Sequence, residues 1–218
     1  MPNDYSTFHE HGNLNQVWQS ISDNNDKLSY QMCEILLTAR GIDKAIIQDL
    51  HDSGKIRGTN KIRNTEAVAF PFTNLNPKQE KKVSAIQGLT INQKPFQIID
   101  YNKFFYKCAN VKENCFFQCC KAIDYTEVKG IVIVEGVVNA VSGATVLPEY
   151  CWIAIGGSEF TKKVEALKEY AMVHNGTINN GIPVICAFDN DEAGSKATLK
   201  AGRILKDINN CIFSIQFP

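Results

Sequence analysis

The C-terminal half of the chain alternates short apolar runs with longer amphipathic stretches. The apolar runs, bounded by glycine, proline or polar residues, predict buried strands over 131–134, 151–155, 183–188 and 211–217. The stretches between them predict helices over about 137–143, 159–174 and 192–207. This strand–helix alternation predicts a parallel, doubly wound sheet with helices on both of its faces.

The N-terminal half has a different pattern. Helical spacing of apolar residues predicts two short helices, over 28–40 and 43–53, each ended by a glycine. Three β-rich runs separated by polar turns predict strands over 67–72, 82–91 and 96–101. We therefore expect a polar tail over 1–27, a small α+β subdomain over 28–127 and an α/β domain over 128–218.

The net charge and the hydropathy of the chain exclude few classes of function. The 218 residues hold 23 Lys and Arg and 23 Asp and Glu, so any basic surface must be local. No apolar run approaches the roughly 20 residues that cross a bilayer, and the N-terminus lacks a signal-peptide pattern. We expect a cytoplasmic protein that does not bind membranes, with its eight cysteines as thiols.

Three acidic residues follow two of the predicted parallel strands. Glu135 comes directly after the first strand, and Asp189 and Asp191 come directly after the third. Because chemistry in open parallel sheets gathers at the carboxyl ends of the strands, we expect these carboxylates to lie together. Crowded carboxylates repel one another, and oxygen ligands favour Mg²⁺ or Mn²⁺ over Zn²⁺. The pattern predicts a divalent-metal site for phosphoryl transfer; the alternative is that Asp189 and Asp191 only cap the helix that begins near 192.

Two further segments could meet phosphate groups. Gly156, Gly157 and Ser158 precede a predicted helix, where backbone amides could cradle a phosphate or simply form a tight turn with a capping serine. Segment 55–63 has no acidic residue, and its four cations could track a nucleic-acid backbone or belong to a solvated loop. These cations are Lys55, Arg57, Lys61 and Arg63.

Four cysteines cluster at Cys108, Cys115, Cys119 and Cys120. Their spacing lacks the regular pair of a zinc knuckle, so we interpret them as free thiols in preference to zinc ligands.

Three segments resemble the signatures of the TOPRIM domain of bacterial-type DNA primases. They are GIVIVEGVVNAVS at 130–142, IAIGGS at 153–158 and VICAFDNDEAGSKAT at 184–198. The resemblance covers about residues 128–218. It extends more weakly upstream, through ARGID at 39–43, AVAFPFTN at 67–74 and AIQGLTI at 85–91, to the N-terminal part of the primase core.

The resemblance implies roles for individual residues. Glu135 is similar to the catalytic glutamate, also close to metal, and Asp189 and Asp191 to the metal-binding pair. Gly136 and Gly194 match backbone-permissive positions of the two motifs, and Lys196 matches a position that is often basic and could meet phosphate. The fold implied is a TOPRIM Rossmann-like parallel sheet with a smaller N-terminal α+β subdomain.

The sequence also departs from the primase pattern. Asn139 stands where primases usually carry an aspartate, and its amide oxygen could still ligate Mg²⁺ without bringing charge. Primases carry a further acidic cluster after the fourth strand, but here the chain stops at Pro218. The Gly-Arg signature appears as Gln87-Gly88-Leu89, and neither a zinc ribbon nor a Walker A sequence occurs.

The hypothesis that follows is a primase-related, Mg²⁺-dependent nucleotidyltransferase core from a phage or mobile element. Its partners would be a single-stranded DNA template, nucleoside triphosphates and a replicative helicase or other replication protein. One alternative is a TOPRIM nuclease that uses the same acids. Another is a non-catalytic module that binds nucleic acid. The sequence does not choose between an RNA and a DNA product.

Overall fold

The computed structural model divides the chain into two compact units, Met1–Lys112 and Glu113–Pro218. The residues described are 14–21, 26–62, 65–74, 83–100, 103–105, 115–120, 128–156, 160–173, 183–206 and 212–214. The boundary between the two units falls upstream of the boundary expected at 127–128, because a strand at 115–119 belongs to the sheet of the second unit.

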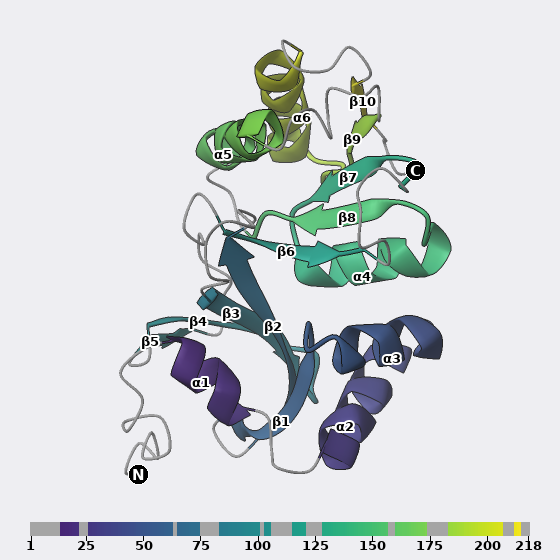
Figure 1. Ribbon diagram of the computed structural model, residues 1–218, viewed down its shortest axis with the longest axis vertical. Coiled ribbons are helices and arrows are strands. Elements are labelled where there is room, and N and C mark those ends of the chain that lie inside the picture. The colour runs from purple at the N-terminus through teal and green to yellow at the C-terminus, as the bar shows by residue number, and fades with distance from the viewer. Residues whose placement is uncertain are drawn as a thin grey trace. The chain divides into compact units, whose positions relative to one another are not determined.

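The described residues of the first unit form three helices and five antiparallel strands (Figure 1). The helices are α1 (Leu14–Ile21), α2 (Asp26–Thr38) and α3 (Lys44–Asp52). The strands are β1 (Arg57–Ile62), β2 (Thr65–Asn74), β3 (Val83–Thr90), β4 (Pro95–Asp100) and β5 (Lys103–Phe105), and they pair in this order. The two helices and three strands expected in this unit are present, with ends shifted by a few residues.

Helix α1 corrects the expectation of a polar tail over residues 1–27. Val17, Trp18 and Ile21 lie on one side of this helix and are buried against apolar side chains of β2, β3 and β4. The segment is rich in polar residues overall, but its few apolar ones have helical spacing and so form one packed stripe. Residues 1–13 lie outside the described part of the chain.

Strand β1 shows that the basic segment is not a solvated loop along its whole length. Residues 57–62 pair with β2, and helix α2 lies directly on the strand. The Ser29 hydroxyl accepts a hydrogen bond from the Gly58 amide at 3.0 Å, and a Cβ on Gly58 would lie 2.1 Å from the Ser29 carbonyl oxygen. Glycine is needed at position 58 because helix and strand meet there backbone to backbone.

The second unit contains the predicted doubly wound sheet. Its elements are β6 (Cys115–Cys119), β7 (Ile131–Val134), α4 (Val137–Val146), β8 (Cys151–Ala154), α5 (Phe160–Val173), β9 (Val184–Cys186), α6 (Glu192–Leu205) and β10 (Ile212–Ser214). The strands pair in the order β10-β9-β7-β8-β6, the first four in parallel. The α/β fold class expected from the sequence is confirmed. Strand β6, which pairs antiparallel with β8, lies in a segment whose pattern did not predict an element.

The connections place helices on opposite faces of this sheet. The chain moves from β7 to β8 through α4, and then back across β7 to β9 through α5. Since such crossovers are right-handed in about 98% of cases, opposite directions of travel put α4 on one face and α5 and α6 on the other. Figure 1 shows α5 and α6 side by side, and α4 lying along β6, β7 and β8.

None of the helices in the described part of the chain is long and apolar enough to span a membrane.

Candidate active site at the carboxyl edge of the parallel sheet

Glu135 lies at the carboxyl end of the central strand β7. The four residues of β7 are all buried, so the apolar strand ends at the first residue that can reach solvent. Glu135 is half-buried, and its backbone carbonyl accepts a hydrogen bond from the Gly156 amide at 2.8 Å. Gly156 has a φ of +66°, which favours glycine. The end of β8 therefore fixes the backbone that carries the Glu135 side chain.

Asp189 and Asp191 follow β9, the neighbour of β7. The two strands are parallel and in register from Ile131 opposite Val184 to Ile133 opposite Cys186, and the Ala187 amide donates to the Ile133 carbonyl at 2.9 Å. The chain leaves β9 at the same edge at which it leaves β7. The structure thus brings the three predicted acidic residues to adjacent strand ends.

These strand ends flank the topological switch point of the sheet. The chain leaves β7 toward α4 on one face, and it leaves β9 toward α6 on the other face. A crevice between such divergent connections is where open α/β sheets bind ligands. Glu135 follows one of the two strands at this switch point, and Asp189 and Asp191 follow the other.

Charge repulsion links the three carboxyl groups. Burial raises the pKa of Glu135 above its ordinary value, and the charges of Asp189 and then Asp191 raise it further. Both aspartates are exposed to solvent, whereas Glu135 is half-buried. A half-buried carboxyl beside two like charges holds its proton more tightly than an isolated glutamic acid does.

Asp191 also caps a helix. Its carboxylate accepts a hydrogen bond from the Gly194 amide at 2.7 Å, in the position of an N-cap for α6. The capping function considered from the sequence is therefore present for Asp191. One carboxylate has two oxygens, so capping through Oδ1 leaves Oδ2 available for a second ligand.

The three carboxyl groups are of the type that binds a hard divalent cation. Three carboxylates from two strand ends supply the oxygen ligands that Mg²⁺ and Mn²⁺ prefer, and the repulsion that raises the pKa of Glu135 is what a cation would relieve. In the described ranges, however, no three His, Cys, Asp or Glu side chains stand close enough together to hold a metal ion already. The acids would have to draw together around the cation.

Part of the second unit also matches a known protein family. Residues 132–218 match the family described as Toprim-like. The domain expected from the three sequence signatures is confirmed, and it contains all three carboxylates.

Solved structures of similar fold come from bacteriophage T7. One is the primase fragment of the T7 primase-helicase protein, with a TM-score of 0.53 and 17% sequence identity. The similarity covers 83% of this chain and 64% of that fragment, so the chain spans less than two thirds of its length. Because 83% of the chain exceeds the Toprim-like domain alone, the shared fold includes much of the N-terminal unit.

A second similar chain comes from a structure of bacteriophage T7 lagging-strand DNA polymerase interacting with primase domains of two gp4 subunits bound to an RNA/DNA hybrid and dTTP. It has a TM-score of 0.56 and 19% identity over 83% of this chain and 78% of that chain. At these identities the likeness is one of fold. No curated protein matches the sequence.

The described residues among the other predicted phosphate ligands lie in or beside α4 and α6, the helices that follow β7 and β9. Gly136 is the N-cap of α4, has a φ of −111° and has open space where a Cβ would stand, so no close contact requires glycine there. Asn139 is exposed on the first turns of α4. Lys196 is exposed and pairs with Glu192 one turn earlier in α6, with Nζ and Oε1 2.5 Å apart. Gly157 and Ser158 lie outside the described residues.

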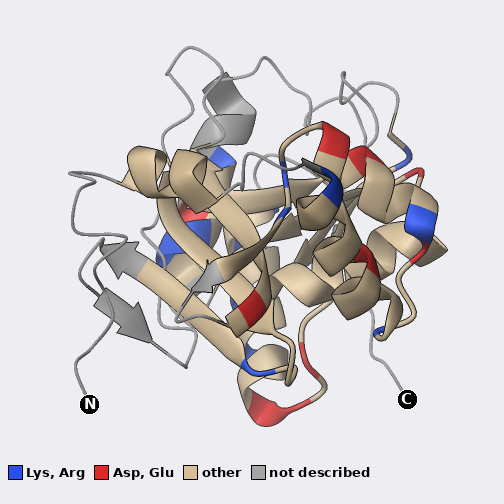
Figure 2. Cartoon of the chain, turned by 90° about the horizontal axis from the view of Figure 1, so that it is seen from below, with Lys and Arg blue, Asp and Glu red and all other residues tan. Residues whose placement is uncertain are grey.

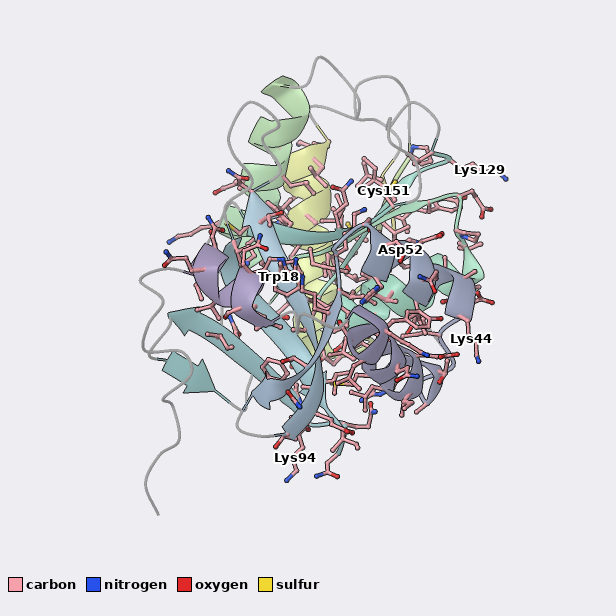
Figure 3. All side chains as sticks on the ribbon, turned by 60° about the horizontal axis from the view of Figure 1, so that its bottom comes forward. Trp18, Lys44, Asp52, Lys94, Lys129 and Cys151 are labelled. Carbon is pink, nitrogen blue, oxygen red and sulfur yellow. The ribbon has the colours of Figure 1, made fainter. Side chains whose placement is uncertain are left out.

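One cation of the predicted nucleic-acid strip packs within the first unit. Arg57 donates to the Trp18 carbonyl at 2.8 Å, and its guanidinium lies 4.8 Å from the centre of the Trp18 ring on α1 (Figure 3). This arginine therefore fastens α1 to β1. Lys55 is half-buried just before the strand, whereas the side chain of Lys61 and all of Arg63 lie outside the described part. Figure 2 shows Lys and Arg spread over several elements among Asp and Glu.

Lys163 is a residue near the site that sequence reasoning did not identify. It lies in the first turn of α5 and has no exposed surface, and its Nζ donates to the Ile155 carbonyl at 2.5 Å. Ile155 precedes the Gly156 whose amide holds the Glu135 carbonyl. Lys163 thus ties α5 to the strand end beside Glu135. Two adjacent lysines at 162 and 163 in an amphipathic helix gave no signal that one of them is buried.

The cysteines of the domain show no metal site among the described residues. Cys115, Cys119 and Cys120 are in no disulfide, and Cys108 lies outside the described part of the chain.

Proposed function

We propose that this chain is a primase-type nucleotidyltransferase core that uses Mg²⁺ or Mn²⁺ to join nucleotides on a single-stranded DNA template. The observation that supports the proposal most strongly is the position of Glu135 and Asp189 on either side of the switch point of the sheet. The Toprim-like family match and the T7 primase fold are consistent with it.

Each acid has a role in this proposal. Asp189 and Asp191, exposed after β9, would hold the cation together with Glu135. The metal, when bound, would neutralise the triphosphate and stabilise the charge that develops during transfer. Glu135, whose pKa is raised by burial and by the two aspartates, would accept the proton of the attacking 3′-hydroxyl. That hydroxyl attacks the α-phosphate, and pyrophosphate leaves.

The wider setting follows from the same proposal. The partners would be the template, nucleoside triphosphates and a replicative helicase or another replication protein, in the cytoplasm of a cell that hosts a phage or mobile element. Lys55 and the other cations of segment 55–63, Arg57 excepted, would contact the template backbone. Asn139 and Lys196 would contact the metal or the triphosphate from α4 and α6.

The test is template-dependent incorporation of labelled ribo- and deoxyribonucleotides with Mg²⁺. Glu135→Gln should lower the rate by roughly 10²- to 10⁴-fold, the usual contribution of a general base. Glu149→Gln is the matched control, because Glu149 is paired with Lys129, 3.6 Å away, at the opposite edge of the sheet. Strand cleavage without synthesis would select a nuclease, and DNA binding that does not depend on metal would select a non-catalytic module.

Asp191 needs a variant that separates charge from capping. Asparagine caps helices about as well as aspartate, so Asp191→Asn should keep α6 intact while it removes a metal ligand charge. We expect Asp191→Asn to lose incorporation by at least tenfold at unchanged thermal stability, with partial recovery at higher Mg²⁺. Full activity of this variant would show that Asp191 is only a cap.

A further inference from the structure

Two thiols of the second unit stand opposite each other on neighbouring strands. Strands β6 and β8 are antiparallel, with Phe117 opposite Ala154, Gln118 opposite Ile153 and Cys119 opposite Trp152. One more step in this register puts Cys120 opposite Cys151. Side chains of directly opposed residues lie on the same face of a sheet, so these two thiols face each other.

The position of this pair in the ladder brings the side chains closer still. The Cys151 amide donates to the Gly130 carbonyl of the segment that enters β7, at 2.9 Å. The backbone polar groups of Cys151 therefore point toward β7 and away from β6. The pair with Cys120 is then of the non-hydrogen-bonded type, in which the two Cα atoms lie about 4.5 Å apart. A disulfide accepts Cα separations from about 4.4 Å.

Direct contact between the two thiols agrees with this geometry. A hydrogen bond with Cys120 is the largest of the causes that raise the pKa of Cys151 well above its ordinary value, ahead of burial. Gln118, on the same face of β6, donates to the Cys151 sulfur at 3.4 Å. By contrast, burial is the main cause that raises the pKa of Cys33 and of Cys186 to about 12, and no second thiol acts on either.

We propose that Cys120 and Cys151 form a dithiol site that closes to a cross-strand disulfide in the presence of a small-molecule disulfide. Cys120 is partly exposed and Cys151 is fully buried, so the oxidant meets Cys120 first. Figure 3 labels Cys151 on β8. The site lies at the start of β8, at the edge of the sheet opposite the carboxylates, and the proposal is independent of the nucleotidyltransferase function.

The reaction balances as two thiol–disulfide exchanges. The Cys120 thiolate attacks one sulfur of the oxidant, forms a mixed disulfide and releases one thiol. Cys151 loses its proton to solvent, attacks the Cys120 sulfur and releases the second thiol. Two protein thiols are thereby oxidised by two electrons, and the oxidant is reduced to two thiols. Because the pKa of Cys151 is raised, the second exchange should quicken as pH rises above neutral.

The disulfide would join the outermost strand of this unit's sheet to its neighbour and close a loop that contains β7 and α4. Closing such a loop restricts the unfolded chain and should raise the melting temperature of the domain by roughly 5 °C or more. The rise should disappear on reduction with dithiothreitol.

The experiment treats the reduced full-length chain with oxidised glutathione at pH 7 and pH 8.5. Blocked, unreduced digests are then mapped by mass spectrometry, and melting is followed in parallel. We expect a peptide that links Cys120 to Cys151 in the wild type and in Cys119→Ser, whose side chain lies on the other face of β6. Cys120→Ser should show neither the link nor the rise in melting temperature.

Three outcomes would overturn the proposal. The first is a stable glutathione adduct on Cys120 with Cys151 still free to alkylate after denaturation. The second is a link from either cysteine to any other thiol, such as Cys119. The third is a linked protein that melts no higher than the reduced one. The mapping is made on the wild-type chain, so it does not depend on whether a variant folds.

Discussion

The backbone at Gly194 passes so close to Asp189 that a side chain could not fit between them. A Cβ on Gly194 would lie 2.0 Å from the carbonyl oxygen of Asp189. The same glycine donates its amide to the Asp191 carboxylate. The first turn of α6 is therefore pressed onto the loop that carries both aspartates, and the helix sets the position of this half of the site.

Gly194→Ala should consequently displace α6 from the loop and lower the free energy of unfolding by about 1–3 kcal/mol, the usual cost of overpacking. Gly202→Ala is the matched control, since it lies in the same helix with nothing within 4 Å of its Cβ position. That change should stabilise the helix by about 0.5–1 kcal/mol. Chemical denaturation of both variants measures the difference. Equal changes in the free energy of unfolding for the two variants would show that the close contact with Asp189 does not affect stability.

The raised pKa of Glu135 gives a stability prediction with a definite sign. A carboxyl whose folded-state pKa is raised favours the folded state below its unfolded pKa, and this contribution is lost as pH rises through the folded pKa. Glu135→Gln, which cannot ionise, should therefore melt higher than the wild type at pH 7–8 without metal. The gap should close below about pH 4, where the carboxyl is protonated in both states.

With a divalent metal present, the wild type should melt at a higher temperature than Glu135→Gln. A bound Mg²⁺ would relieve the repulsion among the three carboxylates, so it should raise the melting temperature of the wild type more than that of Glu135→Gln. Melting curves from pH 3.5 to 8, with and without 10 mM-scale Mg²⁺, measure both effects. A wild type that melts above Glu135→Gln at pH 8 without metal would contradict the repulsion among the acids.

The sequence predicted the Toprim-like sheet because each of its first three parallel strands is an apolar run that is followed by glycine or by an acid. Strand β7 was predicted with its observed ends, and adjacency of Glu135 to the Asp189 loop followed from the alternation of strands and helices. Strand β6 was not predicted, since CFFQC lies in a segment without period or turn signals, and it becomes a strand by pairing with β8. Its secondary structure depends on a partner that follows it by more than thirty residues.

The burial of several residues in polar or charged segments could not be predicted from the sequence either. Helix α1 was missed because its three buried residues lie among Asn, Gln and Ser, and Arg57 was grouped with the basic strip although it packs on Trp18. For Arg57 the residue type favours solvent, and the contact that overrides this preference comes from Trp18, a distant residue in the sequence. Lys163 is the strongest example, because nothing local distinguishes it from Lys162.

Lys163 yields the last prediction. Its ammonium is fully buried and donates to the Ile155 carbonyl, next to the Gly156 amide that holds the Glu135 carbonyl. Lys163→Met keeps the aliphatic stem but removes this donor, which should cost about 1–3 kcal/mol of stability and weaken Mg²⁺ binding by loosening the strand end. The exposed Lys162→Met should change stability by less than about 0.5 kcal/mol. Denaturant titration and Mg²⁺ calorimetry measure the two effects. If the Lys163→Met variant is less stable but binds Mg²⁺ as tightly as the wild type, the lysine only fastens α5 and does not affect the metal site.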